Sequence, residues 1–307
     1  MKFLRAALLL LLFSIPLVAT GAVRSGDFPA GTVWYVHADL EQMRSSDSGG
    51  PLYAWLDGEV FLELRDEIGV DINKETDSVT AFSKPGTGTV VLIKGRISKE
   101  AQQKLLDVAR SEGRLETRKH GKKTYYLSGD GRESHSDGSD PFDSLQESTF
   151  FSFAVNGKLL VASNEDQLKA LIDSNGKISG SKSHEGALFV LSADKTFMQA
   201  GLKTDQFAED DDDWDSKIIR NTEQAALMLS DADGMIAVEA QLVSTDARLA
   251  QSIGGIVNGL VSLQAFNDDL DPEIRTLIQN TRIEVDEKVL TISTVIDPDI
   301  ALAVIDD

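Results

Sequence analysis

Residues 150–176 read FFSFAVNGKLLVASNEDQLKALIDSNG, and this stretch decides the fold class. Two apolar runs flank Asn156-Gly157, and they predict an antiparallel hairpin because Asn and Gly both accept a positive φ in a tight turn. Asn164 follows the second run at the place where its side chain can cap a helix. Three apolar residues then recur at helical spacing: Leu168, Leu171 and Ile172. A hairpin that leads directly into a helix predicts a mixed α+β fold with an antiparallel sheet.

The same alternation of strands and helices continues along the chain. Further hairpins are predicted over residues 78–97, over residues 224–243 around Asp233-Gly234, and over residues 282–296, where the chain closes. Weaker strand patterns lie at residues 114–119 and 123–127. Further helices are predicted, among them one that begins at Pro51, one capped by Ser98, one over residues 245–264 and one that begins at Asp271-Pro272. The helix over residues 245–264 has four apolar residues that we expect on one face: Leu249, Ile253, Ile256 and Leu260.

Two pairs of segments indicate an internal repeat. Residues 31–43 and 186–198 share Gly, Ala, Asp and Met at matching positions, and both read as a strand that runs into an Asp-capped helix. Residues 79–98 and 225–244 both read as strand, turn and strand, followed by Ser. We therefore expect a tandem duplication that gives two similar lobes, each a mostly antiparallel sheet with helices packed on one face. The alternative is that two α+β lobes share common parts by chance.

The chain divides into three parts on composition. Residues 1–22 are a predicted signal peptide, residues 23–177 a first α+β lobe and residues 178–307 a second. A stretch rich in Gly, Ser and Lys over residues 174–183 marks the boundary between the lobes. Residues 128–149 have few side chains that bury area, so we expect them to form a mobile acidic insertion in the first lobe.

The first 22 residues have the layout of a secretory signal. Lys2 and Arg5 precede an apolar run over residues 6–19, and small residues lead to Ala22, after which we expect cleavage. The run has 14 residues, whereas a membrane-spanning helix needs roughly 20. The alternative is a leader that is retained as an N-terminal anchor.

Composition excludes several classes of site. The chain has 307 residues, no Cys, 50 acidic residues and 30 basic residues, for a formal charge of −20. The lack of Cys excludes disulfide scaffolds, thiolate zinc sites, iron–sulfur clusters and cysteine nucleophiles. The negative charge disfavours a nucleic-acid partner. An acidic, Cys-free chain with an export signal predicts a periplasmic or secreted bacterial protein.

The sequence has no catalytic motif. The four histidines, His37, His120, His135 and His184, form no pair at the spacing of a helical metal site. The chain also lacks the Gly-x-Ser-x-Gly motif of serine hydrolases and a complete glycine-rich phosphate loop. We therefore predict neither catalytic residues nor a cofactor.

Carboxylate clusters are the remaining candidates for a metal site. The main run consists of five aspartates: Asp210, Asp211, Asp212, Asp213 and Asp215. Calcium takes six to eight oxygen ligands, but the run does not match the spacing of a calcium-binding loop. Runs of adjacent acids usually stay solvated, so these residues are weak candidates for a divalent cation.

These patterns predict an exported, soluble binding or protein-interaction protein of the bacterial envelope or exterior, without enzymatic activity. We expect contact with another envelope or extracellular protein through a sheet edge, an inter-lobe groove or the insertion. Two alternatives remain, a hydrolase with a site assembled from scattered carboxylates and a calcium-dependent adhesive or matrix component. Three small residues of the long helix, Gly254, Gly255 and Gly259, favour packing on the lobe's own sheet over contact with another subunit.

Overall fold

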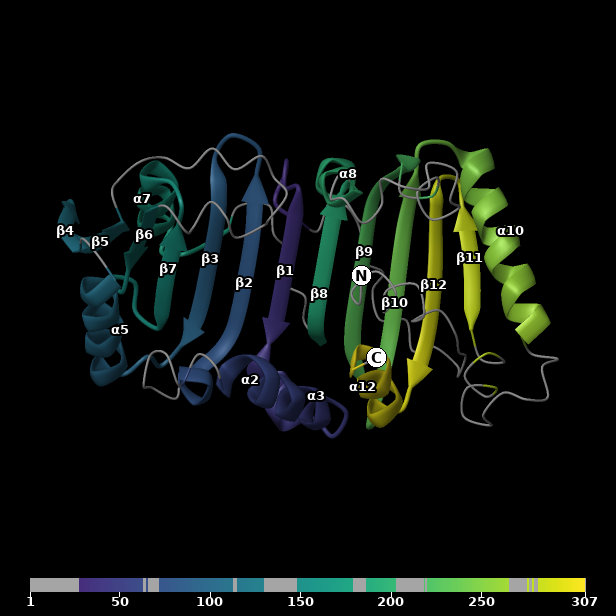
Figure 1. Cartoon of the computed structure of the whole chain (residues 1–307), viewed down its shortest axis with the longest axis horizontal. Helices are drawn as coiled ribbons and strands as arrows, with labels where there is room; N and C mark the ends of the chain where they lie inside the picture. Colours follow the sequence, from purple (N-terminus) through teal and green to yellow (C-terminus); the bar gives the residue numbers. More distant parts are fainter. Residues whose placement is uncertain are drawn as a thin grey trace. The chain divides into compact units, whose positions relative to one another are not determined.

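The computed structural model is a mixed helix and sheet protein with a large amount of antiparallel sheet and few helices (Figure 1). This confirms the predicted α+β class. The structure describes residues 28–62, 65, 72–112, 115–129, 148–178, 186–202, 218, 220–264, 275, 278 and 281–306. The predicted signal peptide lies outside these residues.

The chain folds into two compact units. The N-terminal unit combines residues 26–41 with residues 54–183, and the C-terminal unit combines residues 42–53 with residues 184–307. The segment 42–53 includes the buried Ser48, whose hydroxyl donates a hydrogen bond to the carboxylate of Asp231 in the C-terminal unit. This bond connects the segment 42–53 to the strands of the C-terminal unit.

The sheet of the N-terminal unit has the strand order β1-β2-β3-β7-β6-β5-β4, and every neighbouring pair is antiparallel. The strands are β1 (Trp34–Asp39), β2 (Thr76–Lys84), β3 (Gly88–Gly95), β4 (Leu115–His120), β5 (Lys123–Gly129), β6 (Ser148–Ser152) and β7 (Lys158–Ala162). The helical elements of this unit are η2 (Asp57–Phe61), η3 (Ile72–Glu75), α5 (Lys99–Glu112) and α7 (Glu165–Asp173), whereas most of α2 (Leu40–Ser45) and α3 (Gly49–Leu56) falls in the segment 42–53 of the C-terminal unit. The predicted strands at 114–119 and 123–127 are confirmed as β4 and β5.

The helices of this unit cover both faces of its sheet. Tyr126 packs with Leu106 of α5 in one apolar cluster, whereas the neighbouring Tyr125 contacts the first residue of α7. Adjacent residues of a strand point to opposite faces, so α5 and α7 lie on opposite faces. The prediction of helices on one face is therefore wrong for this unit. The reason is that both faces of β5 carry large aromatic side chains that need cover.

The C-terminal unit has the strand order β8-β9-β10-β12-β11, again with antiparallel neighbours. The strands are β8 (Ala187–Asp194), β9 (Thr222–Ala232), β10 (Met235–Ser244), β11 (Arg282–Asp286) and β12 (Val289–Ile296). The helices are α8 (Lys195–Leu202), α10 (Ala247–Gln264) and α12 (Pro298–Asp306). The chain thus closes on a helix, not on the predicted hairpin. Pro298 occupies the first position of α12, where its missing N–H costs no hydrogen bond.

The predicted apolar face of α10 is wrong at Ile256. Ile253 is buried against β12, but Ile256 is 38% exposed. A Cβ at Gly254 would meet the Val285 side chain at 2.6 Å, so this glycine lets the helix lie close on the sheet. Ile256 is two residues further along and therefore about 200° around the helix. Close packing of the glycine turns Ile256 to solvent.

The hairpins form where they were predicted, but their turns differ. Asp233 and Gly234 both have positive φ, as expected for a two-residue turn between β9 and β10. Between β6 and β7 only Gly157 has positive φ, and residues 153–157 make a wider connection. The carbonyl of Gly157 accepts a hydrogen bond of 3.0 Å from Gly95 N–H. This contact ties the turn to the end of β3.

The predicted insertion is narrower than expected at both ends. Residues 128 and 129 belong to β5, and residues 148 and 149 belong to β6. Residues 130–147 lie outside the described part of the chain. Pairing of β5 with β6 accounts for the difference, because Ser128 faces Thr149 and Gly129 faces Ser148 in the ladder.

Candidate interaction surface at the β4–β5 hairpin

The structure does not describe the predicted metal ligands. Asp210, Asp211, Asp212, Asp213 and Asp215 all lie outside the described residues. Among the residues that are described, no group of three or more acidic or histidine side chains is placed to hold a metal ion. Within the same residues, no helix is both long enough and apolar enough to cross a membrane.

The histidines have ordinary structural partners where they are described. His37 Nδ1 lies 2.8 Å from the hydroxyl of Thr80 on the neighbouring strand. His120 ends β4, and its Nε2 lies 2.9 Å from the carboxylate of Asp173 at the end of α7. His135 and His184 lie outside the described residues.

The glycines of α10 divide between two sides of the helix. Gly254 packs on β11 and β12, as the sequence favoured. A Cβ at Gly255 or Gly259 would have no atom within 4 Å. The nearby Leu263 is 72% exposed. Packing on the unit's own sheet therefore explains only one of the three glycines.

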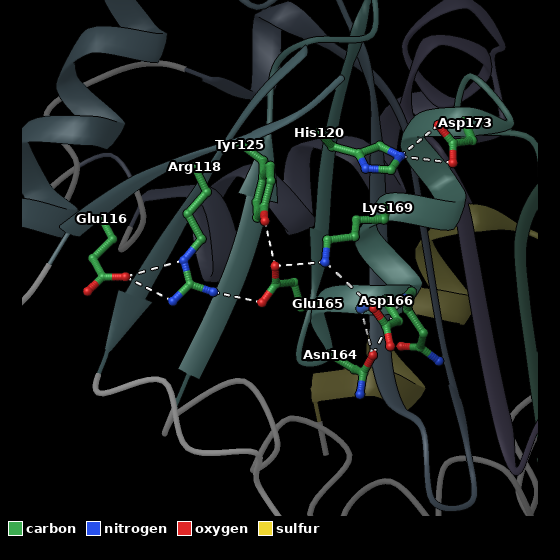
Figure 2. Close-up of polar contacts among 10 residues, drawn as sticks. Glu116, Arg118, His120, Tyr125, Asn164, Glu165, Asp166, Lys169 and Asp173 are labelled. Atoms are coloured by element: carbon green, nitrogen blue, oxygen red, sulfur yellow. Dashed lines mark hydrogen bonds and ion pairs between the residues drawn. The ribbon is translucent and has the colours of Figure 1, made fainter. Parts of the chain in front are cut away.

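The most developed polar cluster joins the β4–β5 hairpin to α7 (Figure 2). Asn164 caps α7 as predicted, because its side chain accepts bonds from the N–H groups of residues 166 and 167 at 2.9 and 3.2 Å. The cap fixes the first turn of the helix. Glu165, the first residue of α7, therefore points its carboxylate at Tyr125 of β5 and Arg118 of β4.

Both oxygens of the Glu165 carboxylate accept bonds from this cluster. The Tyr125 hydroxyl donates to Oε1 at 2.5 Å, and Lys169 Nζ lies 2.9 Å from the same atom. Arg118 Nη1 donates to Oε2 at 2.7 Å. The other nitrogens of the guanidinium bond to Glu116 at 2.9 and 3.2 Å. We call these five residues the α7 clamp.

The electrostatics of the clamp keep its groups in their ordinary charge states. Partial burial works to raise the pKa of Glu165, but bonds from Tyr125 and Lys169 and the charge of Arg118 outweigh it and lower the pKa. Burial, together with the bond to Glu165, raises the pKa of Tyr125. At neutral pH the clamp thus holds an ionised carboxylate and a protonated phenol.

A second set of contacts lies at the C-terminal end of α7. Lys123 Nζ, at the start of β5, donates to the carbonyl of Ile172 at 2.8 Å and so holds the turn end of the hairpin, whereas Lys158 Nζ of β7 donates to the carbonyl of Asn175 at 2.7 Å. Cations at the C-terminal end of a helix are stabilised by the helix dipole. Burial lowers the pKa of Lys158, and its neighbour Lys94 adds to this effect.

The fastened hairpin presents a basic strand at the edge of its sheet. Residues 115–123 contain four basic residues and one acidic residue, in a chain of formal charge −20. Lys119 and Lys122 are exposed. Among the strands that the structure describes, β4 pairs only with β5 and ends the sheet (Figure 1). One row of its backbone N–H and C=O groups therefore has no strand partner in this part of the chain.

Sequence reasoning did not find the clamp. Tyr125 and Glu165 are forty positions apart, and no local pattern links them. The density of basic residues over 114–123 was the available signal for the surface, because such a run contrasts with the acidity of the whole chain.

No protein-family model and no curated protein matches the sequence. Solved structures named "Structure of crystal form III of TP0453" and "Structure of crystal form I of TP0453" are similar in outline. The first has 13% sequence identity and a TM-score of 0.49, covering 94% of this chain and 99% of the other. The second has 14% identity and a TM-score of 0.45, covering 93% and 96%. Likenesses of this extent carry no information on function.

Proposed function

We propose that this chain is an exported, non-enzymatic protein-interaction protein of the bacterial envelope or exterior, and that it binds its partner through the edge of β4. The observation that carries the proposal is an edge strand with one row of backbone groups unpaired by any described strand, set beside exposed lysines. An edge strand is a ready template for a strand from another chain.

The α7 clamp supports this function by holding the edge in place. Arg118 and Tyr125 connect both strands of the hairpin to one carboxylate on α7. A partner that adds a strand to β4 would meet a backbone that is already ordered, so less conformational entropy is lost on binding.

Export is the second part of the proposal. Its support is the leader, in which Lys2 and Arg5 precede an apolar run that ends in small residues up to Ala22. Fractionation of the native organism followed by N-terminal sequencing tests it. We expect the protein in the periplasm or medium, with Val23 as its first residue. A full-length chain in the cytosol would contradict export.

The third part is that the two units arose by tandem duplication and are two similar lobes. The support is a shared order of elements. Residues 34–162 contribute strands in the sheet order β1-β2-β3-β7-β6, and residues 187–296 contribute β8-β9-β10-β12-β11. In both, a long helix follows the third strand. The hairpin of β4 and β5 is then an addition to the first copy. An alignment of diverse relatives, divided at residue 183, should match the halves to each other.

The interaction is tested by capture from a native envelope fraction on immobilised mature protein. Reversing two exposed charges next to the edge, with Lys119→Glu and Lys122→Glu together, should abolish capture. The matched control is Arg96→Glu with Lys99→Glu, which makes the same charge change on two exposed residues, one directly after β3 and one at the start of α5. Equal capture by both variants would show that the partner binds elsewhere.

A further inference from the structure

The edge of the C-terminal unit differs in charge from β4. β11 pairs only with β12 among the described strands and ends its sheet. Its apolar residues Ile283 and Val285 belong to the cluster under α10. Glu284 and Asp286 alternate with them and are exposed. Arg282 lies on the same face and is paired with Glu284 at 2.5 Å, so the face away from the helix presents two carboxylates and one guanidinium.

The C-terminal part of the chain and the β4 segment also carry net charges of opposite sign. Residues 184–307 contain 25 acidic and 8 basic residues, a formal charge of −17. Residues 115–123, which form β4, the turn after it and the first residue of β5, carry a formal charge of +3 from four basic residues and one acidic residue. The basic edge of one copy is therefore complementary in charge to the acidic C-terminal part of a second copy.

We infer that β4 of one copy pairs, edge to edge, with β11 of a second copy of this chain. The inference rests on the proposed function, since it names the partner of the same edge. An antiparallel alignment that sets Lys119 opposite Glu284 also sets Thr117 opposite Asp286. Opposite charges on facing positions stabilise a strand pair, and the paired backbones satisfy both edges.

The lysines of β4 select this partner strand. Lysine on an edge strand normally discourages pairing, because a basic or apolar strand makes no favourable contact with its charge. A second β4 would set Lys119 near its own counterpart, and a second β11 would set carboxylate against carboxylate. An acidic strand avoids this repulsion, so the favoured contact joins β4 of one copy to β11 of the other. Such a head-to-tail contact continues along a row of copies or closes into a ring.

Sedimentation of the mature chain over a range of concentrations tests the inference. The wild type should self-associate in about 0.05 M salt and less in about 0.5 M salt, where surface charges are screened. Lys119→Glu with Lys122→Glu should weaken association about tenfold or more, and so should Glu284→Lys with Asp286→Lys. The control Arg96→Glu with Lys99→Glu should associate like the wild type. Melting temperatures report whether each variant is folded.

Mixing the two reversed variants gives the decisive result. Each has one reversed edge and fails to pair with itself, but the acidic β4 of one matches the basic β11 of the other. The native β4 of the second variant likewise matches the native β11 of the first, so we expect the equimolar mixture to associate like the wild type, with the two variants alternating. A monomeric wild type at low salt, or a mixture that stays monomeric, would overturn the inference. If the wild type is monomeric but envelope capture still depends on Lys119 and Lys122, the self-pairing fails and the proposed function stands.

Discussion

The two edge hairpins, β4–β5 and β11–β12, are attached to their units by different forces. The first combines apolar packing of Tyr126 on α5 with polar contacts, since Arg118 and Tyr125 bond to Glu165 on α7. The second is held by apolar packing, since Val285 lies against Gly254 of α10. Polar attachment depends on pH and salt, whereas apolar attachment depends on the fit of side chains. The comparison teaches that one edge can be loosened without disturbing the other.

The largest loss of stability is expected at Gly254, where α10 packs most closely on the sheet. Gly254→Leu should destabilise the C-terminal unit by about 2–4 kcal/mol, because a side chain there collides with Val285 and Leu290. The matched control is Gly255→Leu on the next residue, whose Cβ would meet nothing within 4 Å. That variant should be neutral or more stable by up to about 1 kcal/mol. Urea unfolding of both variants measures the difference, and equal destabilisation would refute the packing account.

Removal of the clamp carboxylate should have the next largest effect. Glu165→Ala leaves the Tyr125 hydroxyl without its acceptor and Arg118 with only its bonds to Glu116, so we expect a loss of about 1–3 kcal/mol. The control is Asp166→Ala, whose side chain is 93% exposed and 3.7 Å from Lys169, and its cost should be within about 0.5 kcal/mol. Similar unfolding free energies for the two variants would show that the clamp contributes little.

The helix caps are expected to act equally in the two units. Asn164 caps α7, and Asp246 caps α10 by accepting bonds at 2.8 and 3.0 Å. Replacement of either by Ala should cost about 1 kcal/mol of stability. Thermal or urea unfolding compares them directly. A large effect at one cap alone would mean that the units differ in local helix stability as well as in how their edges are held.

The smallest effect is a pH dependence confined to the clamp. The pKa of Glu165 is lowered in the folded chain, so its stabilising contribution is present above the ordinary glutamate pKa of about 4.3. The contribution disappears as pH falls through the lower folded pKa. The unfolding free energy of the wild type should therefore fall more steeply on acidification than that of Glu165→Gln. Parallel curves would contradict the lowered pKa.

Local signals in the sequence predicted the elements well. Asn164 and Ser98 were found as helix caps, and Ser98 accepts a bond of 3.1 Å from the N–H of Ala101. Asp233-Gly234 was found as a tight turn. Each depends on residues within three or four positions of one another, so the physical cause lies within the motif itself.

The features that sequence reasoning missed depend on contacts distant along the chain. The bond from Tyr125 to Glu165 arises only once β5 and α7 lie together. The side of α10 that is buried was set by Gly254 against Val285, so helical spacing alone placed Ile256 on the wrong face. The wider β6–β7 turn likewise follows from the bond between Gly95 and Gly157.

Amide hydrogen exchange in the mature chain tests most directly the claim that β4 is the contact edge. Exchange rates are compared between a low and a high protein concentration, and between samples with and without the envelope fraction. The account predicts added protection at alternate amides of residues 115–120, since every second N–H of an edge strand points outward. If another copy is the partner, residues 282–286 gain protection as well. Protection gained elsewhere, with β4 unchanged, would contradict the account.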